Sequence, residues 1–292
     1  MAVNDERQSS SAHSRALLRA VAWMMGALIS FLTMGVAGRA LSAELPIFEI
    51  VMLRNLICLI VISALIARLG KHLLRPTNLK RHLARNTVHF AAQCGWYFGL
   101  ATIPFVEVFA IEFTVPVWTA ILAALFLEER LSVTRVMAIC LGLVGIVVIL
   151  RPGLVEPSPG TFAVLAAAVG FAIMFVITKN IVNVDRPITI LFWMNLIQLP
   201  IGIVLSIPVW VNPTLDMAPW IALVGAAGIG SHYCLSRAMA LADATIVVTL
   251  DFIRLPLAAV LGWFLYAEPL SFFVLLGAMI ILLGNWLNVR KT

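Results

Sequence analysis

Short polar and charged breaks divide the chain into ten long apolar stretches, and this division constrains its fold more than any other feature. A helix that crosses a bilayer takes about 20 apolar residues, so each stretch is long enough for one span. We therefore predict an all-α integral membrane protein with ten transmembrane helices. The stretches cover approximately residues 17–38, 46–67, 86–103, 105–127, 135–151, 160–179, 187–210, 219–241, 245–266 and 271–288.

The composition excludes most other classes of protein. Hydrophobic residues make up 62% of the 292 residues and charged residues 12%, whereas a soluble domain carries roughly 45–50% and about 25%. Little chain is left for a soluble catalytic domain. The four cysteines stand singly, without metal-ligand or disulfide spacing, so we expect no metal site and no cofactor.

The positions of the Lys and Arg residues predict the orientation. With the N-terminus inside, fifteen of the twenty lie in cytoplasmic segments, two (Arg39 and Arg151) in outer loops, and three within spans. Because cytoplasmic loops retain positive charge, both termini are predicted in the cytoplasm. The same distribution accounts for the net charge of +6, so we expect no nucleic-acid partner.

The two halves resemble each other at an offset of 139 residues. Glu112-Phe113 matches Asp251-Phe252, and the turn at Glu129-x-Leu-Ser132 matches Glu268-x-Leu-Ser271. Each copy holds five spans, an odd number, so the second copy is predicted to be inverted. Inverted repeats are typical of alternating-access carriers with a central binding site. We expect a cytoplasmic tail over 1–15, a first repeat over 16–153 and a second over 160–292.

These features together resemble the drug/metabolite transporter superfamily, and within it the EamA-type ten-helix carriers. The resemblance covers nearly the whole chain. It rests on Phe48-Glu49 with Arg54, Phe113-Thr-Val-Pro116, Leu125-Phe-Leu-Glu-Glu-Arg-Leu-Ser132, Gly142-Leu-Val-Gly145, Leu250-Asp-Phe-Ile-Arg-Leu-Pro256 and Glu268-x-Leu-Ser271.

The resemblance implies a secondary carrier in the bacterial inner membrane, monomeric or homodimeric, that moves a small and partly planar metabolite. The stretch from His89 to Pro116 is most similar to the riboflavin importers, so riboflavin uptake is the favoured expectation. Exporters of aromatic amino acids or drugs, and carriers of S-adenosylmethionine, are the alternatives. The chain has no Walker A sequence, so ATP is not expected as a direct energy source.

Polar residues at membrane depth are the candidates for the substrate site, because each needs a partner, a cavity or a function there. In the third span, Asn86, His89, Gln93 and Tyr97 follow each other at steps of three, four and four, which places them on one helical face beside Trp96. This face either lines a cavity or forms hydrogen bonds to other helices. We expect the cavity to be lined mainly by spans three, four, eight and nine.

The repeat places one carboxylate on each side of the midplane, Glu112 and Asp251. Either acid can bind a cationic group, carry a coupling proton or balance an arginine. Asp251 has Arg254 three residues later on its helical face, so an intrahelical pair is the simpler reading for that acid. Glu112 has no such neighbour in sequence. Arg54 is deep enough in its span to favour a buried partner: Glu49, Glu112 or a substrate anion.

The remaining candidates lie in the fourth, eighth and ninth spans. His232, Tyr233 and Ser236 can line the cavity opposite the third span, and Trp96, Tyr97 or Trp118 can stack on a flat ring, although core packing explains the aromatic residues equally well. Pro116 and Pro256 are candidates for structural or gating roles, together with Arg54 and Arg254. An intramembrane enzyme using His89 and His232 is a remote alternative, because no HExxH, GxSxG or metal-ligand spacing accompanies them.

Overall fold

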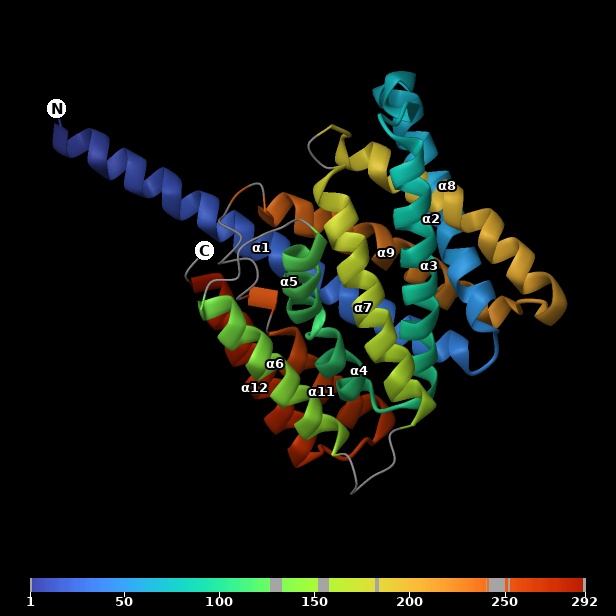
Figure 1. Cartoon of the computed structure of the whole chain (residues 1–292). Helices are drawn as coiled ribbons and strands as arrows, with labels where there is room; N and C mark the ends of the chain where they lie inside the picture. Colours follow the sequence, from blue (N-terminus) through green and yellow to red (C-terminus); the bar gives the residue numbers. More distant parts are fainter. Residues whose placement is uncertain are drawn as a thin grey trace.

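The computed structural model describes residues 2–126, 133–151, 158–181, 184–239, 241, 250–251 and 253–290, with most of their side chains from residue 18 onward. The described chain is mostly helical, and its helices pack together with the N-terminal part of α1 projecting from them (Figure 1). Its first half contains α1 (Ala2–Ser42), α2 (Ile47–Leu69), the short η1 (Lys71–Leu74), α3 (Leu79–Thr102), α4 (Phe105–Glu112), α5 (Val115–Phe126) and α6 (Val133–Leu150). Its second half contains α7 (Pro159–Lys179), α8 (Pro187–Ser206), η2 (Ile207–Val209), η3 (Leu215–Met217), α9 (Ala218–Met239), α11 (Arg254–Tyr266) and α12 (Phe272–Arg290).

Five helical segments of the described chain are long and apolar enough to cross a membrane: Leu18–Ser42, Ile47–Leu69, Phe105–Phe126, Pro159–Thr178 and Pro187–Val209. Shorter apolar helices cover Ile139–Leu150, Arg254–Tyr266 and Phe272–Leu287. Many large apolar side chains on these helices point outward, as expected where lipid is the solvent. The chain is a multi-pass membrane protein, as predicted.

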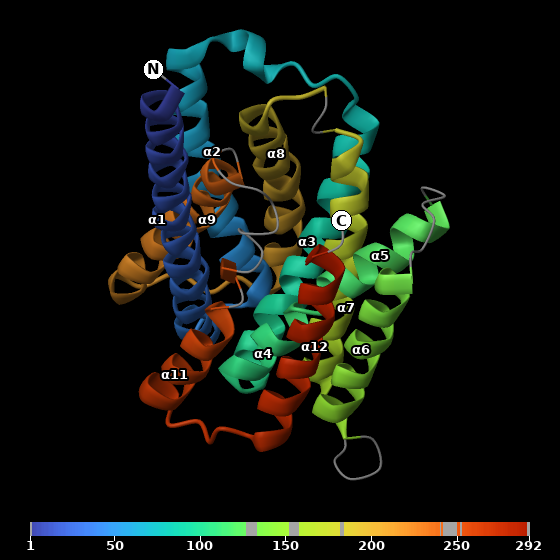
Figure 2. The same cartoon turned by 90° about the vertical axis from the view of Figure 1, so that its left-hand side faces the viewer.

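The pairing of helices reflects the internal repeat. In the internal repeat, α1 of the first half corresponds to α7 of the second, and α3 corresponds to α9. In the structure, α1 packs against α9 and α3 packs against α7. The α1–α9 pair is therefore the symmetry counterpart of the α7–α3 pair. The other main pairs, α2 with α8 and α6 with α12, each join two corresponding helices. Figure 2 shows α1 and α7 running in opposite directions. This is the packing expected of two inverted halves.

The fourth span differs from the continuous helix predicted over 105–127. It consists of α4 and α5, separated at Phe113–Thr114. The physical reason is Pro116, which has no amide hydrogen and whose ring crowds the carbonyl four residues before it, that of Glu112. Asn285 of α12 donates to the carbonyl of Phe113 at 2.9 Å, which satisfies a backbone group that the break leaves open. Discontinuous helices of this kind form binding sites in many carriers.

The other predicted boundaries agree with the structure to within a few residues, with two differences. α1 begins at Ala2, so the helix includes the backbone of the expected tail, and α3 begins at Leu79 rather than residue 86. Of the ninth predicted span, residues 245–249 and 252 lie outside the described part of the chain.

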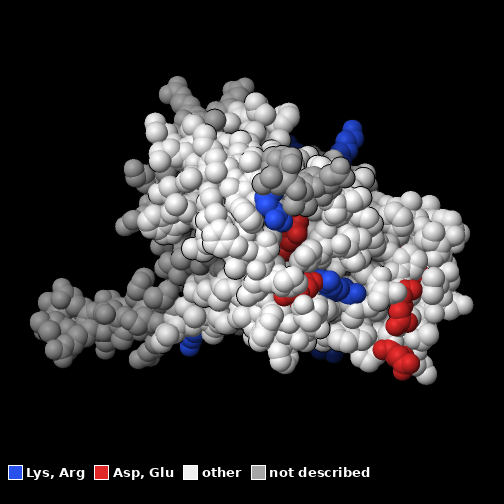
Figure 3. Space-filling model, turned by 90° about the horizontal axis from the view of Figure 1, so that it is seen from below, with Lys and Arg blue, Asp and Glu red and all other residues white. Residues whose placement is uncertain are grey.

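Seen from below, one face of the molecule shows scattered charges, with Lys and Arg beside Asp and Glu rather than a continuous basic surface (Figure 3). Arg39, at the end of α1, lies with its Nη1 atom 2.6 Å from Oε1 of Glu268 and its guanidinium over the ring of Tyr266. Glu268 also accepts the backbone N–H of Phe105 at 2.7 Å. These contacts join the end of α1, the start of α4 and the segment that follows α11.

Candidate functional site

Two clusters of polar side chains lie in the interior between the helices. We call the first the arginine–glutamine cluster, formed by Arg54, His89, Gln93 and Gln198. We call the second the carboxylate cluster, formed by Glu112, Asp251 and Arg254. Both clusters contain residues of both halves, so both lie where the halves meet.

Helix α3 supplies the surface that connects the two clusters. Asn86, His89, Gln93 and Tyr97 are all buried and share the face that the sequence predicts, with Trp96 beside them. Gln93 bonds to the first cluster, and the indole Nε1 of Trp96 donates to Oε2 of Glu112 in the second, at 2.9 Å. One helical stripe therefore contacts both clusters.

In the arginine–glutamine cluster, amide groups surround a buried histidine and a buried arginine. Nη1 of Arg54 donates to Oε1 of Gln93 at 2.5 Å. The Nδ1 atom of His89 lies 3.0 Å from the side-chain amide nitrogens of both Gln93 and Gln198. Because an amide NH₂ can only donate, these contacts hold Nδ1 of His89 as an acceptor. His232 of α9 lies within electrostatic range of the same histidine.

Several polar atoms around this cluster are buried without a hydrogen-bond partner in the structure: Nε of Arg54, Oε1 of Gln198, Nδ2 of Asn86, the hydroxyl of Tyr97, Oδ1 of Asn195 and both side-chain polar atoms of Asn55. A buried polar group without a partner is costly, about 1–3 kcal/mol each. So many such groups in one place are typical of a site that forms additional hydrogen bonds to something it binds.

The charge of this region is positive. Arg54 is only 3% exposed, and its neighbour Arg85 is also buried, bonding to Thr178 and Asn86. Within the described chain, no carboxylate oxygen lies within 4.0 Å of either guanidinium, whereas Arg39 has one such partner and Arg254 has two. Buried cations normally have an anionic partner. The arrangement therefore suits a ligand with an anionic group.

The carboxylate cluster has the opposite balance, two acids around one arginine. Nη1 of Arg254 donates to Oε1 of Glu112 at 3.1 Å, and its Nη2 donates to Oδ2 of Asp251 at 3.2 Å. The guanidinium is also enclosed by aromatic rings, with its Cζ atom 4.7 to 5.5 Å from the ring centroids of Phe31, Phe113 and Phe109. Such rings attract a cation and exclude water.

These contacts answer the questions that the sequence left open for the charged residues. Asp251 does pair with Arg254, three residues later, but Arg254 begins α11 after a turn at Ile253, so the pair does not lie inside one continuous helix as the simpler reading predicts. Glu112 has no basic residue close to it in the sequence, and it forms an ion pair with the same arginine, Arg254, which belongs to the other half. Arg54 does bond to a buried partner, but this partner is Gln93 and neither Glu49 nor Glu112. Glu49 instead accepts the backbone N–H of Val211 at 3.1 Å.

The other predicted residues lie in different places. Tyr233 is 53% exposed on the outer side of α9 and forms an edge-to-face contact with Trp23, 5.6 Å between centroids, so the structure places it away from the central clusters. Trp118 donates to Oγ1 of Thr114 at 3.1 Å, beside the break. Pro116 and Pro256 lie in the first turns of α5 and α11. The side chain of Ser236 lies outside the described residues.

Sequence reasoning missed Gln198 and Arg85. Both were detectable, Gln198 with Asn195 as polar residues inside the apolar stretch 187–210, and Arg85 as a charge one residue before the third stretch. The sequence does not show which residues meet across the interface. Gln198 contacts His89 although the two residues are 109 positions apart. The polar interior consequently includes α2 and α8 as well as α3, α4, α9 and α11.

A third polar contact lies at the opposite end of the bundle from Glu268. Nε2 of the buried His82 is 2.8 Å from Oδ2 of Asp185, and Thr77 donates its backbone N–H and its hydroxyl to Oδ1, at 3.0 and 2.6 Å. Burial alone favours the neutral form of Asp185, but the hydrogen bonds from His82 and Thr77 outweigh it and lower the pKa of the carboxyl. This contact joins the segment before α3 to the segment before α8.

In the described part of the chain, no group of three or more His, Cys, Asp and Glu side chains is arranged to hold a metal ion. The four cysteines are free thiols.

Comparisons with known proteins agree with this architecture. An S-adenosylmethionine uptake transporter of Rickettsia bellii is 27% identical over 90% of this chain and 90% of its own length. Riboflavin transporters of Rhizobium johnstonii and Vibrio cholerae are 29% and 26% identical, over 99% and 91% of this chain and 97% and 91% of theirs. A solved crystal structure has the same fold, with a TM-score of 0.66 and 19% identity over 93% of this chain and 96% of that one. The model of the EamA-like transporter family matches residues 18–151 and again residues 158–290, and the chain belongs to this family.

Proposed function

We propose that this protein is a secondary carrier of the bacterial inner membrane, with both termini in the cytoplasm, and that it works by rocking one five-helix half against the other. Membership in a transporter family identifies it as a transporter of a small metabolite rather than an enzyme. The inverted packing of the halves supports the alternating-access mechanism.

The observation that carries the proposal is that both polar clusters are shared between the halves. Glu112 belongs to the first half and Arg254 to the second, and their bond lies beside the helix break at Phe113. His89 and Gln198 likewise come from different halves. A rocking motion changes the distances across these contacts, so a ligand that replaces them is bound in one arrangement and released in another.

For the substrate, we propose a small metabolite that carries both an anionic and a cationic group. The anionic group binds near Arg54 and Arg85, which have no carboxylate partner in the described chain, and the cationic group binds near Glu112 and Asp251, which share one arginine. S-adenosylmethionine has this chemistry, since it carries a carboxylate, an ammonium and a sulfonium. Four curated relatives are named as uptake transporters for it.

Riboflavin is the second candidate, favoured by its named transporters in Rhizobium johnstonii and Vibrio cholerae and by the resemblance of the stretch from His89 to Pro116. Its flat ring requires an aromatic surface for stacking. Trp96 and Tyr97 are 4% and 1% exposed, and Trp96 packs edge-to-face against Tyr97 and Phe109. This covered arrangement supports ionic recognition more than stacking.

The test is uptake by proteoliposomes that contain the purified protein. We expect saturable uptake of radiolabelled S-adenosylmethionine that excess unlabelled substrate abolishes, and much weaker uptake of riboflavin. An Arg54→Gln variant should lose uptake, and Arg68→Gln, which removes an exposed arginine of the same helix, should retain it. Uptake of riboflavin alone would support the second candidate. Absence of any uptake, with resistance of expressing cells to toxic aromatic amino-acid analogues, would support an exporter.

A further inference from the structure

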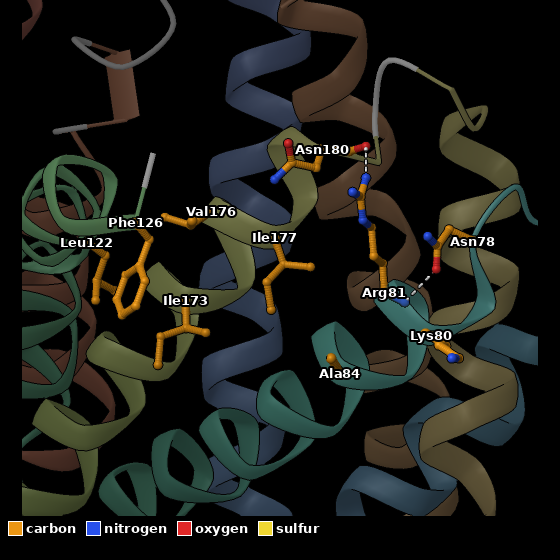
Figure 4. Close-up of a pocket in the computed structure, with 10 residues that line it drawn as sticks. All are labelled: Asn78, Lys80, Arg81, Ala84, Leu122, Phe126, Ile173, Val176, Ile177 and Asn180. Carbon is orange, nitrogen blue, oxygen red and sulfur yellow. Dashed lines mark hydrogen bonds between the residues drawn. The ribbon is translucent and has the colours of Figure 1, made fainter. Parts of the chain in front are cut away.

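A groove of about 700 Å³ lies on the outside of the bundle, where α3, α5 and α7 meet (Figure 4). α7 provides the apolar floor with Ile173, Val176 and Ile177, and Phe126 of α5 forms one wall. Lys80 and Arg81 of α3 stand at the other side, near one end.

This groove is separate from the central clusters. At 100° per residue, Lys80, Arg81 and Ala84 lie on the side of α3 roughly opposite to the buried residues His82, His89 and Gln93. The side chains of Lys80, Arg81 and Ala84 are exposed. The groove therefore faces the surroundings of the protein, which along α5 and α7 are lipid.

The lining is polar at one end and apolar along its length. Lys80 and Arg81 lie in the first turn of α3, and Asn180 lies directly after α7. Nη1 of Arg81 is 3.4 Å from the backbone oxygen of Asn180, and this contact is exposed. Among the described lining residues there is no carboxylate to neutralise these two cations. Seven residues separate Asn180 from Ile173, so the apolar floor extends roughly 10 Å from the charged end.

We propose that the groove binds one anionic phospholipid of the cytoplasmic leaflet. The lipid phosphate contacts Lys80 and Arg81 at the charged end, and an acyl chain lies along Ile173, Val176 and Phe126. Basic residues between transmembrane helices on the cytoplasmic side attract anionic headgroups, and this end of α3 is cytoplasmic in the orientation that the positive charges predict. A phosphate without an acyl chain would leave the apolar floor unused, which favours a lipid over a soluble anion.

The experiment is native mass spectrometry of the purified full-length protein in detergent, titrated with phosphatidylglycerol or with phosphatidylcholine. We expect one tightly bound phosphatidylglycerol and weaker phosphatidylcholine binding. The double variant Lys80→Gln/Arg81→Gln should weaken phosphatidylglycerol binding by roughly thirtyfold, because each cation near an anionic headgroup contributes about a factor of five. Its control, Arg68→Gln/Arg75→Gln, removes two exposed arginines at the same end of the bundle but outside the groove, and should change binding by less than about twofold.

A second pair of variants tests the apolar part without changing charge. Ala84→Trp places an indole in the groove and should weaken lipid binding, whereas Leu83→Trp places it on an exposed neighbouring position outside the lining and should not. Equal binding of the two lipids, equal losses in variant and control, or full competition by inorganic phosphate would each overturn the proposal. Lipid binding is measured without substrate, so its failure is distinguishable from a failure of the transport proposal.

Discussion

Arg254 of the second half donates a hydrogen bond to Glu112 of the first half, 3.1 Å between Nη1 and Oε1. The same guanidinium bonds Asp251, which occupies in the second repeat the position that Glu112 occupies in the first. One arginine thus holds the two symmetry-related acids. Because only one half provides the arginine, the two acids are equivalent in sequence but differ in their surroundings: Asp251 bonds to it from the segment just before α11, and Glu112 bonds to it from the other half.

We predict that Glu112 carries the coupling proton. Its bond to Arg254 crosses the interface and is therefore the contact that a rocking motion remakes. Glu112→Gln keeps an acceptor for Trp96 and Arg254 but removes the ionisable group. We expect it to lose accumulation driven by a pH gradient and to retain exchange at saturating substrate, with a higher apparent KM because Glu112 also lies near the proposed position of the cationic group. Both are measured in proteoliposomes.

The matched control for this prediction is Glu44→Gln, an exposed acid beyond the end of α1. It should behave as wild type in both assays. If Glu112→Gln still accumulates substrate against a gradient, Glu112 does not carry the proton.

Arg54 is predicted to bind the anionic group of the substrate. Arg54→Gln removes the charge, and because hydrogen bonds to charged groups contribute about 1.5–3 kcal/mol, the apparent KM should rise by about ten- to a hundredfold. Arg54→Lys keeps the charge but not the geometry of the bond to Gln93, so its apparent KM should lie between those of the wild type and of Arg54→Gln. A change in maximal rate alone, with an unaltered apparent KM, would contradict a binding role. The initial uptake rate at varied substrate concentration provides both numbers.

The sequence contains most of the information on the fold, because spans are long apolar segments and their boundaries are charges, prolines and glycines. The break at Phe113–Thr114 was also marked, by Pro116, but the stretch around it is apolar throughout and its hydropathy shows no interruption. Only part of the candidate site could be predicted from the sequence. The stripe on α3 follows from helical spacing, yet the contact of His89 with Gln198 depends on how α3 and α8 pack, which no local pattern contains.

Asp185 is predicted to stabilise the protein in its ionised form. Replacing it by Asn should lower the free energy of unfolding by about 1–3 kcal/mol near neutral pH, because the buried His82 and Thr77 lose a charged partner. The pKa of Asp185 is lowered in the folded protein, so its contribution is complete above the unfolded pKa of about 3.9 and is lost as the pH falls through the lower folded value.

The difference in thermal midpoint between wild type and Asp185→Asn should therefore stay constant from about pH 6 to about pH 5 and narrow below about pH 4. Thermal unfolding in detergent, followed by intrinsic tryptophan fluorescence, measures it. Asp216→Asn, at an exposed position, is the control and should show no such difference. A difference that grows as the pH falls would have the wrong sign for this mechanism.

The packing of α6 against α12 depends on a mutual close approach of two glycines. A Cβ atom on Gly145 would lie 2.7 Å from the backbone oxygen of Gly277, and a Cβ atom on Gly277 would lie 2.6 Å from that of Gly145. Because both obstacles are backbone atoms, they move only if the helices separate. Gly145→Val should destabilise the protein by about 1–3 kcal/mol, measured as a lower thermal midpoint in detergent. Val144→Leu, one residue earlier on the exposed side of α6, also adds volume and should leave the midpoint unchanged; an equal loss in both variants would show that the glycine contact is not the cause.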